Sequence, residues 1–302
     1  MTDPRHEPLA YEELTVSVPG GELAVLRWPA TVADAPTVIA LHGITANALA
    51  WGEPARQLAG RATLIAPDLR GRGASRAVSG PYGLARHADD VAALAAALGL
   101  GRFSLAGHSM GAWVAALTAV RHPALVERLI LVDGAVTFPL PLGADEGEVL
   151  AAVLGPALAR LSMTFADRAE YRAFWRKHPA LAEEWSDTTD AYTQRDLVGA
   201  EPELRSSCVL AAVQEDGGQV LLDPEAASAV HRLPCRAELL WAERGLLDEP
   251  QGLYDAQRLE LAALDPERIT VTAVPGTNHY TVLVGPRGAA LIAERLLGRS
   301  GV

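Results

Sequence analysis

One short run constrains the fold of this chain more than any other. From Phe103 to Trp113 the sequence is FSLAGHSMGAW, an apolar strand that breaks at Gly-x-Ser-x-Gly and continues as an alanine-rich helix. A serine on such a sharp strand-to-helix turn has a strained backbone and an exposed hydroxyl. Side chains at Gly107 and Gly111 would collide with the neighbouring strand and helix. We therefore predict that Ser109 is a nucleophile.

Two further motifs support this interpretation, because Gly-x-Ser-x-Gly alone is common enough to occur by chance. The run Leu-His-Gly-Ile at residues 41–44 ends an earlier apolar strand that begins at Thr37. A late strand near the C-terminus is followed by Gly-Thr-Asn-His, which ends at His279. With these three motifs the chain resembles the α/β-hydrolase superfamily, from about residue 11 to about residue 297.

Strand and helix patterns alternate along most of the chain. A hairpin is expected around Pro19 and Gly20. Further strands are expected at residues 37–41, 62–67, 102–106, 126–132, 237–241 and 269–274, and helices at 48–58, 87–98, 110–121, 253–264 and 286–297. This alternation favours an α/β fold with a parallel, doubly wound sheet covered on both faces. The resemblance implies a mostly parallel sheet of eight strands, the α/β-hydrolase fold.

The alternation stops between about residue 137 and residue 233, where helices with polar loops and many aromatic residues are expected. We predict a core formed by residues 1–136 and 234–302, with an inserted helical cap at residues 137–233. The resemblance implies that this cap covers the active site. We expect Trp175 and Trp185 to bind a mostly apolar small-molecule substrate. The alternative is a helical subdomain that only shields the core.

A serine nucleophile needs a base, a carboxylate that orients the base, and donors for the oxyanion that forms. His279 lies on a loop just past a strand and is the predicted base. Met110 begins the helix after the nucleophile, where backbone amides lack partners within the helix. Its N–H is one expected oxyanion donor. The resemblance implies Ile44 as the second donor, with His42 orienting the loop.

The position of the acid is open in the sequence. The resemblance places an aspartate after the strand at residues 237–241, in a run like Gly-x-x-Asp, but Gly245 stands at that position. Three carboxylates can substitute for it. They are Asp133 at the end of the strand at 126–132, Asp248 three residues beyond the usual position, and Glu243 before it. We predict Asp133, because some α/β-hydrolases carry their acid at the end of this strand, and keep Asp248 and Glu243 as alternatives.

Composition argues against several classes of function. The formal net charge is −11, which disfavours nucleic acid and anionic membranes as partners. No apolar run approaches the roughly 20 residues that span a bilayer. The chain has no metal-ligand spacing, and the glycine-rich run at residues 68–73 lacks the Lys-Ser/Thr of a phosphate-binding loop. We expect no metal, no cofactor and a structural role for that run, and a homodimer is compatible with the sequence.

The N-terminal sequence lacks the basic start and apolar core of a signal peptide. The only two cysteines, Cys208 and Cys235, are expected to be free buried thiols. Both observations favour a cytoplasmic location.

The predicted function is a serine hydrolase that cleaves an ester, lactone or thioester through an acyl-enzyme. A serine in the nucleophile position argues against dehalogenase and epoxide hydrolase chemistry, which need a carboxylate there. Two alternatives remain. One is a cyclase, lyase or carbon–carbon bond hydrolase that uses the same triad, and the other is a ligand-binding protein with slow turnover.

Overall fold

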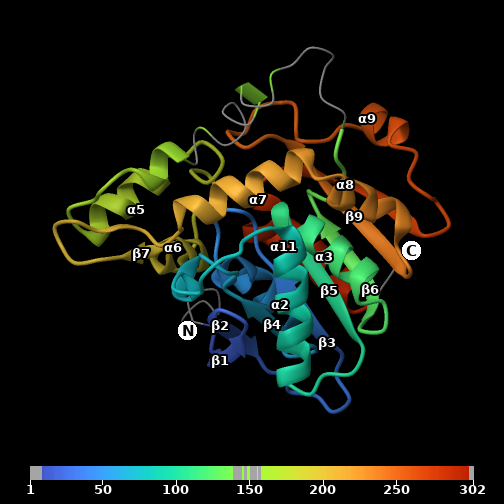
Figure 1. Ribbon diagram of the computed structural model, residues 1–302. Helices are drawn as coiled ribbons and strands as arrows, with labels where there is room; N and C mark the ends of the chain where they lie inside the picture. Colours follow the sequence, from blue (N-terminus) through green and yellow to red (C-terminus); the bar gives the residue numbers. More distant parts are fainter. Residues whose placement is uncertain (1–8, 139–144, 146–147, 150–154, 156–157, 299–302) are drawn as a thin grey trace, which may run out of the picture.

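A computed structural model describes residues 9–138, 145, 148–149, 155 and 158–298 (Figure 1). Its centre is an eight-stranded sheet with the strand order β1-β2-β4-β3-β5-β6-β9-β10. The strands are β1 (Glu12–Val18), β2 (Gly21–Trp28), β3 (Thr37–Leu41), β4 (Thr63–Pro67), β5 (Phe103–His108), β6 (Val126–Val132), β9 (Arg236–Arg244) and β10 (Ile269–Asn278). The β1–β2 and β2–β4 pairs are antiparallel, and every other pair is parallel. The predicted α/β class with a mostly parallel eight-stranded sheet is confirmed.

Helices cover both faces of this sheet, so that two apolar cores form. One face carries α1 (Gly52–Leu58), α10 (Thr281–Val284) and α11 (Pro286–Leu296), and the other carries α2 (Leu84–Ala97), α3 (Met110–Arg121) and α9 (Ala256–Leu261). Strand β3 contributes side chains to both cores. Ile39 and Leu41 pack into the core with α2 and α3, while Val38 and Ala40 pack into the core with α1 and α11. This is the period-two alternation of a strand that is buried on both faces.

Between β6 and β9 the chain leaves the sheet. This segment contains α5 (Arg168–Arg176), α6 (Asp187–Arg195), α7 (Leu210–Leu222) and α8 (Pro224–Ala229), with a small antiparallel pair of β7 (Leu197–Val198) and β8 (Arg205–Ser206). Short 3₁₀ helices are η2 (Ala48–Trp51), η3 (Gly73–Ser75) and η4 (Val230–Arg232). Figure 1 shows α5 and α6 to the left of α7, which crosses above α2 and α3. Strands of two residues are too short to produce a readable alternation in sequence, so β7 and β8 were not predicted.

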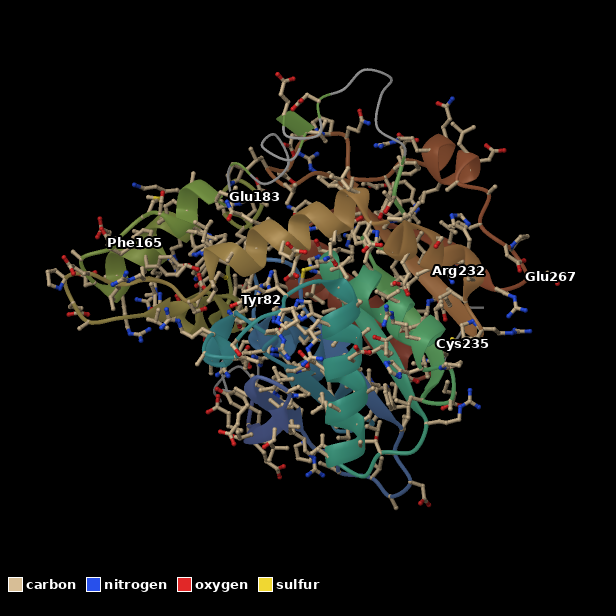
Figure 2. The ribbon with its side chains drawn as sticks, in the orientation of Figure 1. Tyr82, Phe165, Glu183, Arg232, Cys235 and Glu267 are labelled. Carbon is tan, nitrogen blue, oxygen red and sulfur yellow. The ribbon has the colours of Figure 1, made fainter. Side chains whose placement is uncertain are left out.

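The two cysteines are free thiols, as the sequence predicted. Cys208 follows β8 and is partly buried, and Cys235 is buried just before β9 (Figure 2). Within the described ranges, no helix is long and apolar enough to cross a membrane.

Candidate active site

The Gly-x-Ser-x-Gly run forms the turn between β5 and α3. Ser109 has a φ of 52°, a left-handed conformation that residues with side chains seldom adopt. A Cβ atom at Gly107 would collide with the backbone of Gly111, and one at Gly111 would collide with the carbonyl group of Leu41. Only glycine fits at both positions, as the sequence predicted. The turn therefore holds Ser109 where β5 ends and α3 begins.

A hydrogen bond joins Asp133 and His279. The Oδ2 atom of Asp133 lies 2.6 Å from Nδ1 of His279, and both side chains are buried. The Oδ1 atom of Asp133 accepts the N–H of Ala242 at 3.0 Å, and the Asp133 N–H donates to the carbonyl oxygen of Leu240 at 2.7 Å. Strand β9 lies between β6 and β10 in the sheet. A carboxylate at the end of β6 thus reaches across the end of β9 to the histidine that follows β10.

The other two carboxylates that the sequence offered are bonded elsewhere. Asp248 accepts a hydrogen bond from Nε of Arg244 at 2.7 Å, and this bond holds the pKa of Asp248 below its ordinary value. Glu243 accepts the backbone N–H of Gly276 in β10 at 2.9 Å. Of these three described carboxylates, the structure brings Asp133 to His279.

Ile44 and Met110, the two residues whose backbone amides were predicted as oxyanion donors, line one cavity with Ser109 and His279. Met110 is the first residue of α3 and has no N–H partner one turn earlier in that helix. Ile44 lies in a tight turn at residues 43–46. A hydrogen bond of 3.2 Å closes this turn, from the N–H of Ala46 to the carbonyl oxygen of Gly43. A Cβ atom on Gly43 would lie 3.2 Å from the Cβ atom of Ser109, so this turn passes directly over the serine.

Two further buried histidines, both uncharged, form hydrogen bonds that hold the backbone of the site in place. His42 accepts the N–H of Leu69 on Nε2 at 2.9 Å, so its Nδ1 carries the hydrogen and donates to the carbonyl oxygen of Gly43 at 2.7 Å. His108 donates from Nε2 to the carbonyl oxygen of His279 at 2.8 Å. Burial lowers the pKa of His42 to about 4 and the pKa of His108 to about 3. Both rings therefore stay uncharged at neutral pH.

The cavity has a volume of about 620 Å³ and mostly apolar walls. Its aromatic side chains come from the core and from the segment between β6 and β9; they are Trp113, Phe138, Tyr192, Tyr254 and Tyr280. Val220 and Leu221 of α7 add aliphatic surface. None of these wall residues was identified from the sequence, because the face that a helix turns toward a cavity depends on how it packs.

Trp175 and Trp185 were predicted to bind substrate, and the structure places neither of them in the wall of this cavity. Trp175 is buried on α5, where it packs edge-on against Tyr171, and the guanidinium of Arg160 lies 5.2 Å from the centre of its ring. Trp185 is stacked under the guanidinium of Arg176 at 5.4 Å. The aromatic content of the segment indicated apolar packing, and much of that packing is internal to the segment.

Comparisons with known proteins identify the fold family of the chain. A profile of the α/β hydrolase fold matches residues 36–286. The chain is 29% identical to 2-(acetamidomethylene)succinate hydrolase of Mesorhizobium japonicum over 260 residues, which cover 83% of this chain and 84% of that protein. The crystal structure of a hypothetical protein from Pseudomonas aeruginosa PAO1 has a TM-score of 0.73 and 28% identity, covering 95% of this chain and 98% of that one.

A shorter match joins the chain to an uncharacterised protein of Mycobacterium tuberculosis. The two are 41% identical over 103 residues, which make up 34% of this chain and 30% of that protein. The match thus spans less than a third of the length of this relative.

Proposed function

The chain belongs to the α/β hydrolase fold family, and from this premise we propose that it is a serine hydrolase with the triad Ser109, His279 and Asp133. One observation carries the proposal. The buried hydrogen bond from His279 to Asp133 orients a histidine that lines the same cavity as Ser109. A serine hydroxyl is a poor nucleophile at neutral pH unless such an oriented base accepts its proton.

The chemistry follows from the hydrogen bonds of His279. Asp133 accepts the hydrogen on Nδ1, so Nε2 keeps its lone pair and can take the proton of the Ser109 hydroxyl. As Oγ bonds to the substrate carbonyl carbon, the N–H groups of Ile44 and Met110 stabilise the oxyanion. The intermediate collapses, Nε2 gives its proton to the leaving oxygen of an ester or lactone or the leaving sulfur of a thioester, and an acyl-enzyme remains. Water, activated by His279, then attacks the acyl-enzyme through the same steps, which releases the carboxylic acid and restores the serine.

The substrate that we propose is an ester, lactone or thioester of a mostly apolar small molecule. The cavity walls support this choice, because each buried CH₂ group contributes about 0.8 kcal/mol to binding. The test is a panel of p-nitrophenyl esters of increasing acyl length, together with lactones. We expect kcat/KM to rise with acyl length until the cavity is filled. Absence of turnover across the whole panel would contradict the proposal.

An amide that carries carboxylate groups is a second candidate. Arg258 of α9 lies in the cavity wall, where its guanidinium is 4.3 Å from the centre of the Phe138 ring. A guanidinium in this position can pair with a substrate carboxylate. The similar protein from Mesorhizobium japonicum is named for the hydrolysis of 2-(acetamidomethylene)succinate. Adding N-acyl dicarboxylates to the panel distinguishes the two candidates, because only this second one favours them over neutral esters.

A pair of variants tests which residues select the substrate. Val220→Phe adds bulk to the cavity wall, and we expect it to lower the ratio of kcat/KM for octanoate over acetate by about tenfold or more. Trp175→Phe is the control, because Trp175 does not line the cavity: its ring packs against Tyr171 and reaches the wall only through an edge contact with Tyr280. It should lower the melting temperature and leave the ratio unchanged. A shift in the ratio for Trp175→Phe alone would show that the cavity wall has been assigned wrongly.

A further inference from the structure

The turn that carries the Ile44 amide is held by buried side chains at three consecutive carbonyl groups. His42 Nδ1 donates to Gly43 O at 2.7 Å, Arg72 Nε to Ile44 O at 2.9 Å, and Arg160 Nη2 to Thr45 O at 3.2 Å. In a trans peptide the C=O and the following N–H point in opposite directions. The direction of the Gly43 carbonyl therefore sets the direction of the Ile44 N–H, and the next two contacts restrict rotation of the rest of the turn.

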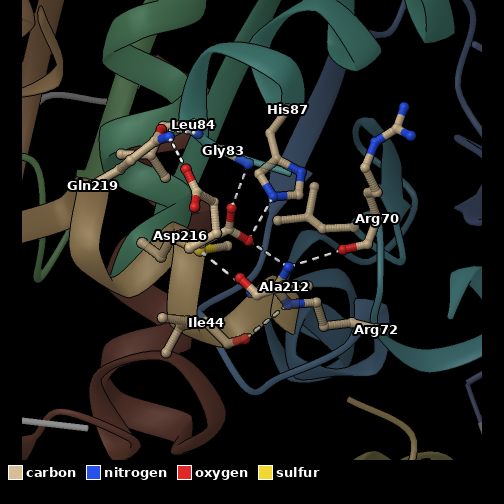
Figure 3. A network of polar contacts seen from close by, with 12 residues as sticks. Ile44, Arg70, Arg72, Gly83, Leu84, His87, Ala212, Asp216 and Gln219 are labelled. Atoms are coloured by element: carbon tan, nitrogen blue, oxygen red, sulfur yellow. Dashed lines mark hydrogen bonds and ion pairs between the residues drawn. The ribbon is translucent and has the colours of Figure 1, made fainter. Parts of the chain in front are cut away.

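Arg72 belongs to a network that reaches from the turn to α7 (Figure 3). Its fully buried guanidinium is 2.5 Å from Oδ2 of Asp216 on α7. Asp216 also accepts Nε2 of His87 at 2.9 Å. Burial alone would raise the pKa of Asp216, but His87 and Arg72 together hold it well below its ordinary value. The carboxylate therefore stays charged, and it fixes the position of Arg72.

Arg160 belongs to a second network, in which an arginine again joins a carbonyl group of the turn to a buried aspartate. Its Nη1 atom lies 2.5 Å from Oδ2 of Asp196, the residue that follows α6. The hydroxyl of Tyr171 on α5 donates to the same carboxylate oxygen at 2.6 Å. Both aspartates, Asp196 and Asp216, come from the segment between β6 and β9. Two separate parts of that segment are thus connected to one turn of the core.

We propose that Arg72 and Arg160 are positioning residues that fix the turn carrying the Ile44 N–H and anchor this turn to Asp216 and Asp196. The chemistry of the guanidinium supports this role, since its rigid fork of donors can bind a carboxylate and a carbonyl oxygen at once, which a lysine ammonium does less well. Oxyanion donors act by being fixed in place before the charge develops. This inference rests on the proposed acyl-transfer function.

The test compares Arg72→Lys with Arg70→Lys. Lysine keeps the charge beside Asp216 and loses the directed bond to Ile44. Arg70 is equally buried and pairs with Asp90 at 2.7 Å, but its side chain bonds residues away from the turn, which makes it a matched control. The measurements are kcat and KM for one ester, and the inhibition constant of a trifluoromethyl ketone with the same acyl chain, whose hemiketal oxygen mimics the oxyanion.

We expect Arg72→Lys to lower kcat by about 10- to 100-fold, less than the 10²- to 10³-fold loss typical of deleting a donor. KM should change little, and the ketone should bind more weakly in proportion to the loss of kcat/KM. Arg70→Lys should lower the melting temperature and keep kcat within about twofold of the wild type.

If Arg72→Lys does not fold, Arg160→Lys is tested instead, with Arg172→Lys as its control. Arg172 lies in the same segment, but its guanidinium pairs with Asp190 and not with the turn. The proposal is overturned if a folded lysine variant keeps kcat within about twofold of its control, or if ketone affinity does not fall with kcat/KM. A wild-type protein that hydrolyses no ester and binds no ketone would refute the proposed function itself, and this inference with it.

Discussion

Replacing Ser109 by alanine is expected to reduce kcat by about 10⁴- to 10⁶-fold, since members of a triad act as a unit and the remainder supplies only binding and oxyanion stabilisation. The fold should stay intact. Alanine meets the same backbone restriction as serine at a φ of 52°, so the turn gains no additional strain. The measurement is ester hydrolysis together with a thermal unfolding curve. A variant that retains more than a tenth of the wild-type kcat would refute the nucleophile assignment.

Replacing Asp133 by asparagine should lower kcat by about 10⁴-fold. The oxygen of the amide can still accept the N–H of Ala242, but its NH₂ group would then face Nδ1 of His279. A donor at that position favours the wrong tautomer of the imidazole, with the hydrogen on Nε2, and the ring loses its ability to accept the serine proton. The same uncharged side chain no longer stabilises the imidazolium that forms during attack.

Asp248→Asn is the matched control for Asp133→Asn, because Asp248 pairs with Arg244 and accepts a hydrogen bond from Asn278, but does not contact His279. Its kcat should stay within about tenfold of the wild type. The opposite pattern, with Asp248→Asn inactive and Asp133→Asn active, would mean that the loop after β9 rearranges to bring Asp248 to the histidine. If both variants lose only a small part of the wild-type kcat, the enzyme works with a serine–histidine dyad.

Local sequence patterns predicted the sheet and the strand-to-helix turn at Ser109 well, for identifiable reasons. Helix α3 begins and ends at the predicted residues, Met110 and Arg121, and β6 likewise at Val126 and Val132. A buried strand and an amphipathic helix each leave a periodic pattern within a few residues. The turn at Ser109 depends on two glycines that lie beside it in sequence. Such features can be read without knowing the rest of the fold.

The sequence alone did not determine which carboxylate pairs with His279. The choice of Asp133 over Asp248 depends on which strands are neighbours, since β6 and β10 flank β9 in the sheet although more than a hundred residues separate them in the chain. Sequence patterns indicate strands and do not give their order. Gly245 showed only that the acid had to come from elsewhere.

The contacts that join the core to the segment between β6 and β9 could not be predicted from the sequence either. Arg72 and Asp216 lie far apart in sequence, as do Arg160 and the turn at residues 43–46. No periodic pattern marks such pairs. The same limitation explains the prediction for Trp175, because an aromatic residue on a predicted helix can face a cavity or the interior of its own segment.

Reaction with a fluorophosphonate, followed by intact-mass measurement and peptide mapping, tests the triad most directly. The probe loses fluoride as an activated serine Oγ bonds to phosphorus, so it reports on the nucleophile without any assumption about the substrate. We expect one adduct per chain, located on Ser109, absent from Ser109→Ala and formed far more slowly by His279→Ala. A protein that stays unlabelled, or that carries the adduct on another residue while Ser109 remains free, would contradict the assignment of Ser109, His279 and Asp133 as a catalytic triad.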